Sequence, residues 1–95
     1  MNEVEWDDVK DADNLAKRGL PLRYGALLFD GPFVEEEDAR KDYGESRFKA
    51  VGPIPEFADR IFVVIYTWRE NKRRIISFRK ANDREIREYQ ENVDG

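Results

Sequence analysis

The sequence predicts an α+β protein, and three features carry that prediction. Residues 60–68 are β-branched or aromatic at nearly every position, which is typical of a strand buried on both faces. Residues 73–80 form a second strand-like run, and the short connection between the two runs indicates an antiparallel hairpin. Segments before and after this hairpin instead show the apolar spacing of helices. We treat residues 1–95 as one domain, because half of this length approaches the ~40 residues below which a core rarely sustains itself.

A short strand and a helix are predicted at the start of the chain. Residues 3–6 alternate in the manner of a strand, and Asp7 or Asp8 can cap a helix over residues 9–18. Gly19 suits the position just after that helix. The apolar residues of the helix form one stripe on an otherwise polar surface: Val9, Ala12, Leu15 and Ala16.

A second helix and a mainly acidic segment are predicted next. Pro21 restarts the chain, and the apolar residues 22–29 indicate a short, mostly buried helix that Asp-Gly-Pro at 30–32 ends. A short edge strand fits residues 33–36. The remainder up to Glu45 is expected to be loop.

An antiparallel meander of three to four strands and a C-terminal helix complete the predicted fold. Residues 46–52 alternate as a strand, which Pro53 is expected to stop. In the hairpin that follows, Asn71 tolerates the positive φ that a tight turn requires. Asn82 and Glu85 have the spacing of a capping box at the start of the last helix. The apolar stripe of that helix consists of Ile86, Tyr89 and Val93.

The residue types absent from the chain exclude most of the usual catalytic groups. The chain has no cysteine and no histidine, so it can hold no disulfide, thiolate nucleophile, imidazole base or Cys/His metal site. The acidic run 35–38 lacks EF-hand spacing, and we expect neither a metal nor a cofactor. Any chemistry must therefore use Lys, Arg, Tyr, Ser and carboxylates.

The charge of −4 is distributed unevenly. Residues 1–45 carry 13 acidic and 6 basic side chains, a net −7, whereas residues 46–95 carry 8 and 11, a net +3. The segment 69–80 alone holds six basic residues and one acidic residue, so one surface could attract a polyanion. No apolar run approaches the ~20 residues of a membrane span and the N-terminus is acidic, so we expect a cytoplasmic protein.

The strand 73–80 is the most informative part of the chain for function. Strict alternation would place Arg73, Ser77 and Arg79 on one face, where two guanidinium groups and a hydroxyl could hold one phosphate. The same charges are also expected on any exposed hairpin, and the two interpretations have about equal weight.

Other polar residues have ordinary structural explanations beside functional ones. Lys17 and Arg18 suit the C-terminal end of a helix dipole. Glu85 is first a cap, and Tyr89 is first a packed aromatic residue.

Several stretches of the chain resemble the BrnT-type toxin family. The specific one is Arg-Ile-Ile-Ser-x-Arg-Lys-Ala at 74–81, followed by Glu85 and Tyr89. The resemblance spans about residues 3–89 and implies a RelE-like fold and a ribonuclease of a bacterial type II toxin–antitoxin pair. The other similar pieces are Glu5-Trp6-Asp7, Asn14-x-x-Lys17-x-Gly19, Phe29-Asp30-x-Pro32, Arg47-Phe48-x-Ala50-Val51-Gly52 and Val63-Val64-x-Tyr66-Thr67.

The resemblance implies a metal-independent endoribonuclease that inhibits translation, in which a ribose 2′-OH attacks the adjacent phosphate. RelE-like enzymes use Lys, Arg and Tyr where other ribonucleases use His, which fits a chain without histidine. We expect Arg74 and Arg79 to hold the scissile phosphate. Developing charge would be stabilised by Lys17 or Lys80, and proton movement would be assisted by Glu85 or Tyr89. Further contacts to RNA phosphates are expected from Arg18, Arg47, Arg73, Ser77 and Lys80.

One position departs from the family pattern. The family usually has Lys-His-Gly after the first helix, whereas this chain has Lys17-Arg18-Gly19. If activity depends on the imidazole, the chain is an inactive relative that binds an antitoxin or RNA. If the side chain only binds phosphate, Arg18 replaces the histidine well.

The resemblance also implies a partner. This would be a ribbon-helix-helix antitoxin that joins two toxins in a two-plus-two complex. The toxin would contact DNA only through that antitoxin, and its own substrate would be RNA.

Overall fold

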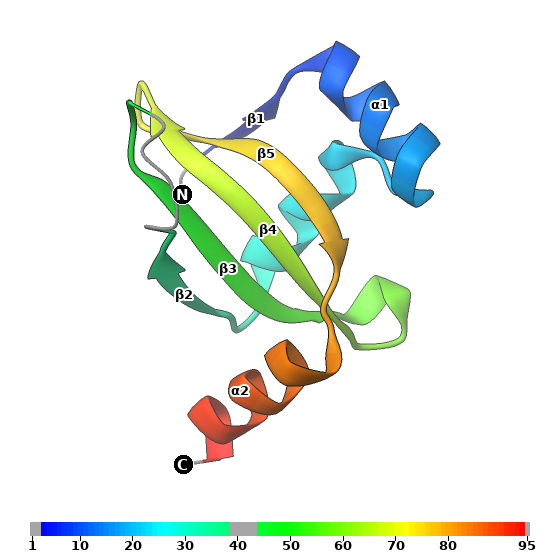
Figure 1. Cartoon of the computed structure of the whole chain (residues 1–95), viewed down its shortest axis with the longest axis vertical. Helices are drawn as coiled ribbons and strands as arrows, with labels where there is room; N and C mark the ends of the chain where they lie inside the picture. Colours follow the sequence, from blue (N-terminus) through cyan, green and yellow to red (C-terminus); the bar gives the residue numbers. More distant parts are fainter. Residues whose placement is uncertain (1–2, 39–43, 95) are drawn as a thin grey trace.

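The computed structural model describes residues 3–38 and 44–94, in which helices flank a mixed five-stranded sheet (Figure 1). The strands lie in the order β1-β5-β4-β3-β2. Strands β2 to β5 form an antiparallel meander, and β1 adds to β5 in parallel. The strands are β1 Val4–Trp6, β2 Val34–Glu37, β3 Arg47–Ile54, β4 Arg60–Arg69 and β5 Lys72–Lys80. The helices are α1 Asp8–Arg18, the 3₁₀ helices η1 Leu22–Asp30 and η2 Pro55–Phe57, and α2 Asp83–Asp94. The α+β prediction is therefore confirmed.

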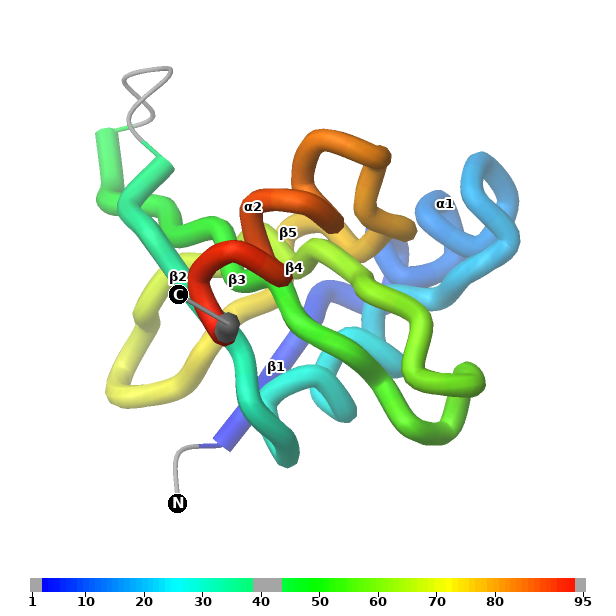
Figure 2. Tube along the Cα trace, turned by 90° about the horizontal axis from the view of Figure 1, so that it is seen from below, coloured from blue at the N-terminus to red at the C-terminus, as the bar shows by residue number. Residues whose placement is uncertain are grey.

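The two faces of the sheet carry separate apolar cores. Figure 2 shows α2 on one side of the sheet and the segment of η1 on the other. On one side, which we call the η1 face, Leu22 and Leu28 of η1 pack against the sheet. On the other, the α2 face, Tyr89 of α2 packs on Val51, Val63 and Ile65. Strand β4 contributes to both cores, as its apolar sequence predicts. None of the helices in residues 3–38 and 44–94 is long and apolar enough to cross a membrane.

A β-bulge in β5 changes which side chains share a face. Ile65 of β4 lies opposite Ser77, but the next residue, Tyr66, lies opposite Ile75. Ile76 is therefore an extra residue in β5, and the alternation of side chains shifts by one position there. As a result, Ile75 and Phe78 both belong to the core of the η1 face although they are three residues apart.

The first helix turns its polar side toward the protein. Asp7 caps α1 by accepting hydrogen bonds from two backbone N–H groups, and Gly19 after it has a φ of +74°. The buried residues of α1 are Asp11 and Asn14, whereas Val9 is 78% exposed and Leu15 46% exposed. The apolar stripe seen in the sequence thus faces outward, where a helix stripe ordinarily faces the core.

Side-chain hydrogen bonds hold α1 in this orientation. The Asn14 amide donates to the carbonyl oxygens of Leu20 (2.6 Å) and Phe78 (2.9 Å). Asp11 accepts from the backbone N–H and the guanidinium of Arg23. These contacts fix the helix beside β5 without an apolar interface.

Several predicted strand limits were wrong by one or two residues. The edge strand expected at 33–36 is Val34–Glu37, and the strand expected at 46–52 is Arg47–Ile54 and includes Pro53. Because β2 pairs with β3 only as far as Val51, Pro53 sits at an edge, where its missing N–H removes no ladder hydrogen bond. The expected loop up to Glu45 falls partly outside the described residues. In the β4–β5 turn, Asn71 has a φ of +66°, as predicted.

Candidate functional site

Basic side chains from β3 and β5 gather on the α2 face. Thr67 of β4 lies opposite Arg47 on one side and Arg74 on the other. Ile65, two residues earlier on the same face, lies opposite Lys49 and Ser77. Val63 lies opposite Arg79. Because residues opposite one another share a face, these pairings place four cations and one hydroxyl on the α2 face: Arg47, Lys49, Arg74, Arg79 and Ser77.

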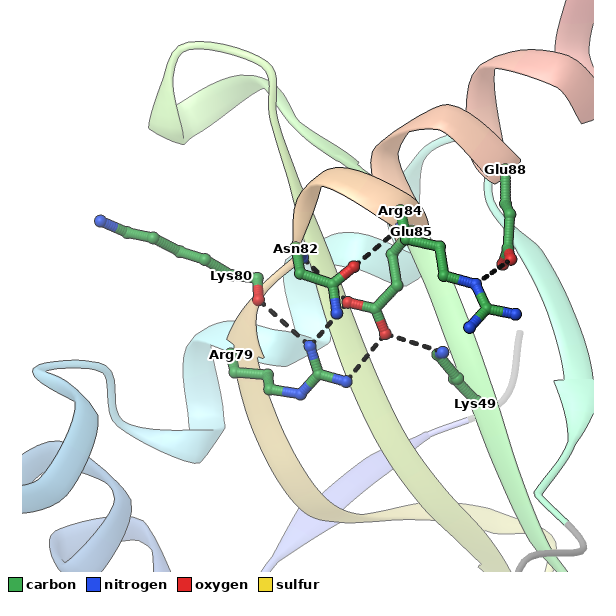
Figure 3. Close-up of polar contacts among 7 residues, drawn as sticks. All are labelled: Lys49, Arg79, Lys80, Asn82, Arg84, Glu85 and Glu88. Carbon is green, nitrogen blue, oxygen red and sulfur yellow. Dashed lines mark hydrogen bonds and ion pairs between the residues drawn. The ribbon is translucent and has the colours of Figure 1, made fainter.

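Glu85 is the centre of the part of this face that α2 covers (Figure 3). Its carboxylate accepts a bidentate pair of hydrogen bonds from Arg79, each 2.8 Å long. The ammonium of Lys49 lies 2.7 Å from the same carboxylate. The capping box is also present, since the backbone N–H of Asn82 donates to Glu85 and the Glu85 N–H donates to the Asn82 side chain. One carboxylate thus anchors α2 to both β3 and β5.

The charge state of Glu85 follows from these contacts. Hydrogen bonds from Arg79 lower the pKa of Glu85 far below its usual range, although burial opposes the shift; Lys49 and the Asn82 N–H lower it further. The carboxylate, only 5% exposed, is therefore ionised throughout the physiological range. It is suited to hold Arg79 and Lys49 in place rather than to exchange protons.

Arg74 lies on the same face, near the beginning of β5, and contacts two carboxylates. Its guanidinium donates to Glu5 of β1 at 2.8 Å and lies 3.6 Å from Asp7. The pKa of Asp7 is lowered, chiefly because its side chain accepts the backbone N–H of Lys10. Arg47 is 3.6 Å from Glu45. Each of these four cations therefore has an internal counter-ion, which an incoming phosphate would have to displace or share.

Arg73 lies on the opposite face, so the predicted grouping of Arg73 with Ser77 and Arg79 was wrong. The bulge at Ile76 is the cause, because it puts Arg73 on the η1 face and Ser77 and Arg79 on the α2 face. The Arg73 guanidinium carbon lies near four aromatic rings at 4.4 to 5.7 Å, as in cation–π pairs. The rings are those of Phe29, Phe33, Tyr66 and Trp68.

Tyr66 and Glu35 complete the polar contacts beside Arg73. The Tyr66 hydroxyl donates a short hydrogen bond to Glu35. Burial, reinforced by that carboxylate, raises the pKa of Tyr66 to about 12. Tyr66 is 1% exposed. It is neutral at physiological pH, because its pKa lies well above that range.

The remaining predicted residues are scattered. Lys17 and Arg18 lie at the exposed end of α1, where Lys17 pairs with Asp13 at 3.1 Å. The side chain of Lys80 extends away from Glu85 (Figure 3). Tyr89 packs in the core of the α2 face and is 7% exposed. Among the residues predicted from sequence, the structure thus gathers Arg47, Arg74, Ser77, Arg79 and Glu85 on one face.

Three residues at this face escaped the site predictions made from the sequence. Lys49 could have been found from strand alternation, because it is two residues from Arg47 in β3. Glu5 and Asp7 are brought to Arg74 by the parallel pairing of β1 with β5, which no local pattern signals. In the described residues, no three His, Cys, Asp or Glu side chains gather in a way that could hold a metal ion.

Comparison with known proteins assigns the chain to a class. Its structure is similar to the crystal structure of the Brucella abortus ribonuclease toxin, BrnT, with 25% sequence identity and a TM-score of 0.62. The match covers 87% of this chain and 100% of that one, so the class is that of small α+β ribonuclease toxins.

Residues 6–85 match the family described as "Ribonuclease toxin, BrnT, of type II toxin-antitoxin system". The chain belongs to the BrnT toxin family, which confirms the resemblance noted in its sequence. Among curated proteins, none matches the sequence. Membership of a type II toxin–antitoxin family implies an antitoxin partner and an RNA substrate.

Proposed function

We propose that this chain is the toxin of a type II toxin–antitoxin system and acts as a metal-independent endoribonuclease that inhibits translation. In this proposal residues 1–95 form one domain with a RelE-like fold that works in the cytoplasm. Cleavage proceeds by attack of a ribose 2′-OH on the neighbouring phosphate. The family supplies the general activity, and the residues of the α2 face support the chemistry.

The observation that carries the proposal is the uncovered half of the α2 face. Arg74 and Arg47 flank Thr67 there, and Ser77 lies opposite Ile65 on the same face. Their side chains are partly exposed, at 24% for Arg74 and 22% for Arg47, so a phosphate can reach them. Guanidinium groups bind phosphate oxygens in bidentate fashion, which fits a polyanion laid across these strands.

Arg79 completes the phosphate site in this proposal. Glu85 holds its guanidinium by two hydrogen bonds, so the group is oriented before any substrate arrives. Such preorganised charge is usually the largest catalytic contribution, and loss of one good donor typically costs about 10²-fold or more in rate. Glu85 thereby becomes a positioning residue, while Tyr89 stays part of the core that supports α2.

A third lysine is a candidate for stabilising the charge that develops during cleavage. Lys49, held beside Arg79 by Glu85, joins Lys17 and Lys80. Arg18 belongs to the proposal as a phosphate contact in place of the usual family histidine.

The test uses the purified chain, single-stranded RNA and a chelator. Wild type should cut the RNA with EDTA present, and induced expression should arrest growth. Arg79→Gln and Arg74→Gln should each lose at least about 10²-fold in rate. The matched control is Arg84→Gln, because Arg84 lies on the outer side of α2 and pairs with Glu88 at the surface. Wild type that neither cuts RNA nor arrests growth would refute the enzyme proposal.

The alternative is a catalytically inactive relative that binds RNA or the antitoxin. The exposed cation at position 18, where the family usually has histidine, favours it. This alternative predicts RNA binding that weakens steeply with salt and yields no product. Arg18→His separates the two, since gain of cleavage in that variant alone would show that the imidazole is required.

For the partner, we propose a ribbon-helix-helix antitoxin in a two-plus-two complex, with DNA contacted through the antitoxin. Co-expression with the neighbouring reading frame, followed by co-purification and measurement of mass in solution, tests both the partner and the stoichiometry.

A further inference from the structure

Arg74, one of the two arginines proposed to hold the scissile phosphate, has a carboxylate directly beside it. Glu5 of β1 is the register partner of Arg74, and their side chains meet at 2.8 Å. Its neighbours Val4 and Trp6 pack on the core of the η1 face, so alternation directs Glu5 to the α2 face. The Glu5 side chain is 31% exposed, and β1 lies far from α2 (Figure 1).

Attack by a 2′-OH sets a geometric condition on any general base. The 2′-oxygen and the phosphorus that it attacks must come within ~3–3.5 Å of each other. The group that takes the proton must lie within hydrogen-bond reach of that oxygen. A general base for this reaction therefore has to sit next to a cation that binds the phosphate. Four described carboxylates form ion pairs with Arg47, Lys49, Arg74 or Arg79: Glu5, Asp7, Glu45 and Glu85.

Three of these carboxylates meet the condition poorly. Glu85 is 5% exposed and already accepts hydrogen bonds from Arg79 and the Asn82 backbone, with Lys49 at 2.7 Å. Asp7 uses one oxygen to cap α1 and lies 3.6 Å from Arg74. Glu45 lies 3.6 Å from Arg47, beyond hydrogen-bond distance. Glu5 combines exposure with a direct hydrogen bond to its arginine.

We propose that Glu5 is the general base of the cleavage reaction and that Arg74 joins this base to the scissile phosphate. The Glu5 carboxylate takes the proton of the 2′-OH while the 2′-oxygen forms a bond to phosphorus. The bond from phosphorus to the 5′-oxygen breaks, and that oxygen takes a proton from water. The products are a 2′,3′-cyclic phosphate and a 5′-hydroxyl end. This inference rests on the proposed ribonuclease function.

The decisive variant is Glu5→Gln, because it keeps the shape and removes the base. Loss of a general base typically costs 10²–10⁴-fold, so kcat should fall by about that factor. Glu5→Gln should not weaken substrate binding, because Arg74 loses an anion that competes with the substrate phosphate. We therefore expect the affinity for an uncleavable 2′-deoxy analogue of the substrate to stay equal or to rise.

Other roles for Glu5 give different results. If Glu5 only holds Arg74 in place, Glu5→Gln should weaken binding of the analogue together with cleavage. If Glu5 only screens Arg74, the variant should bind and cleave better than wild type. Either result overturns the proposal.

Two further variants complete the experiment. Glu45→Gln is the matched control, since it makes the same change beside Arg47 and should leave kcat within about threefold of wild type. Glu5→Asp keeps the carboxylate but shortens its reach, so it should lie between wild type and Glu5→Gln. If Glu5→Gln does not fold, Glu5→Asp provides the test instead.

The outcomes separate this inference from the function on which it rests. If wild type cleaves and Glu5→Gln has the same kcat, the assignment of Glu5 is wrong and the ribonuclease function stands. If wild type cleaves no RNA, the ribonuclease proposal itself fails, and the assignment fails with it.

Discussion

Replacing Glu85 by alanine should strongly destabilise the packing of α2 on the sheet. The substitution removes the bidentate partner of Arg79, the counter-ion of Lys49 and one half of the capping box. Removing one partner of a buried ion pair typically costs 3–5 kcal/mol. Arg79 and Lys49 are 27% and 21% exposed and regain some hydration, so we expect about 3 kcal/mol.

The assay is urea unfolding followed by the fluorescence of the two tryptophans, Trp6 and Trp68. In a thermal melt of a domain of this size, a loss of about 3 kcal/mol should lower the melting temperature by roughly 12–24 °C. Glu88→Ala is the matched control on the same helix, because Glu88 pairs with Arg84 at the surface. It should cost less than about 0.5 kcal/mol.

The cost should also depend on pH in a defined direction. The folded-state pKa of Glu85 lies far below its ordinary value of 4.5, so its stabilisation is fully present above about pH 4.5. It is lost as the pH falls toward the folded-state pKa, and the difference between wild type and Glu85→Ala should shrink on acidification. The reasoning is refuted if Glu85→Ala costs no more than Glu88→Ala at pH 7.

Three other predictions concern stability. Tyr66→Phe should remove a loss of stability at alkaline pH. Folding raises the pKa of Tyr66 from 10.0 to about 12, so the free energy of unfolding of wild type should fall by up to about 2 kcal/mol between pH 10 and 12. Comparing alkaline unfolding of the two proteins tests this, and equal losses would contradict it. Gly52→Ala should cost about 1–3 kcal/mol of stability in thermal melts, because the new Cβ would lie 2.7 Å from the backbone oxygen of Pro32. Gly31→Ala is the control and should be neutral, because a Cβ there meets nothing within 4 Å. Asn14→Ala should cost about 1–3 kcal/mol and raise hydrogen exchange in α1, because two buried carbonyl oxygens lose their donor; unchanged exchange there would argue against this anchor.

The elements of the fold were predictable where local chemistry decides the structure. The run 60–68 gave the central strand because its side chains suit two buried faces. The capping box at Asn82 and Glu85 located α2, because the motif satisfies backbone groups within one turn. By contrast, the parallel pairing of β1 with β5 joins segments almost 70 residues apart, and no short-range pattern encodes it.

The site was predictable in composition but not in its arrangement. The sequence identified β5 as the basic strand, yet placed Arg73 on the wrong face. A bulge is determined by packing against the neighbouring strand, and the run Ile75-Ile76 offers apolar side chains to both cores. Similarly, the apolar stripe of α1 was visible, but its outward orientation depends on Asn14 reaching the carbonyl oxygen of Phe78 across the fold.

The bulge at Ile76 is a position at which β5 can change its length without turning its later side chains to the other face. Strand β5 has nine residues, and the extra one, Ile76, shifts the alternation of side chains between the two faces by one position along the sequence. Deleting Ile76 itself should leave a regular ladder in which Arg79 still lies opposite Val63, because Ile75 and Ser77 already lie opposite neighbouring residues of β4. We therefore expect β5 to tolerate the loss of this one residue with Arg79 still turned toward Glu85.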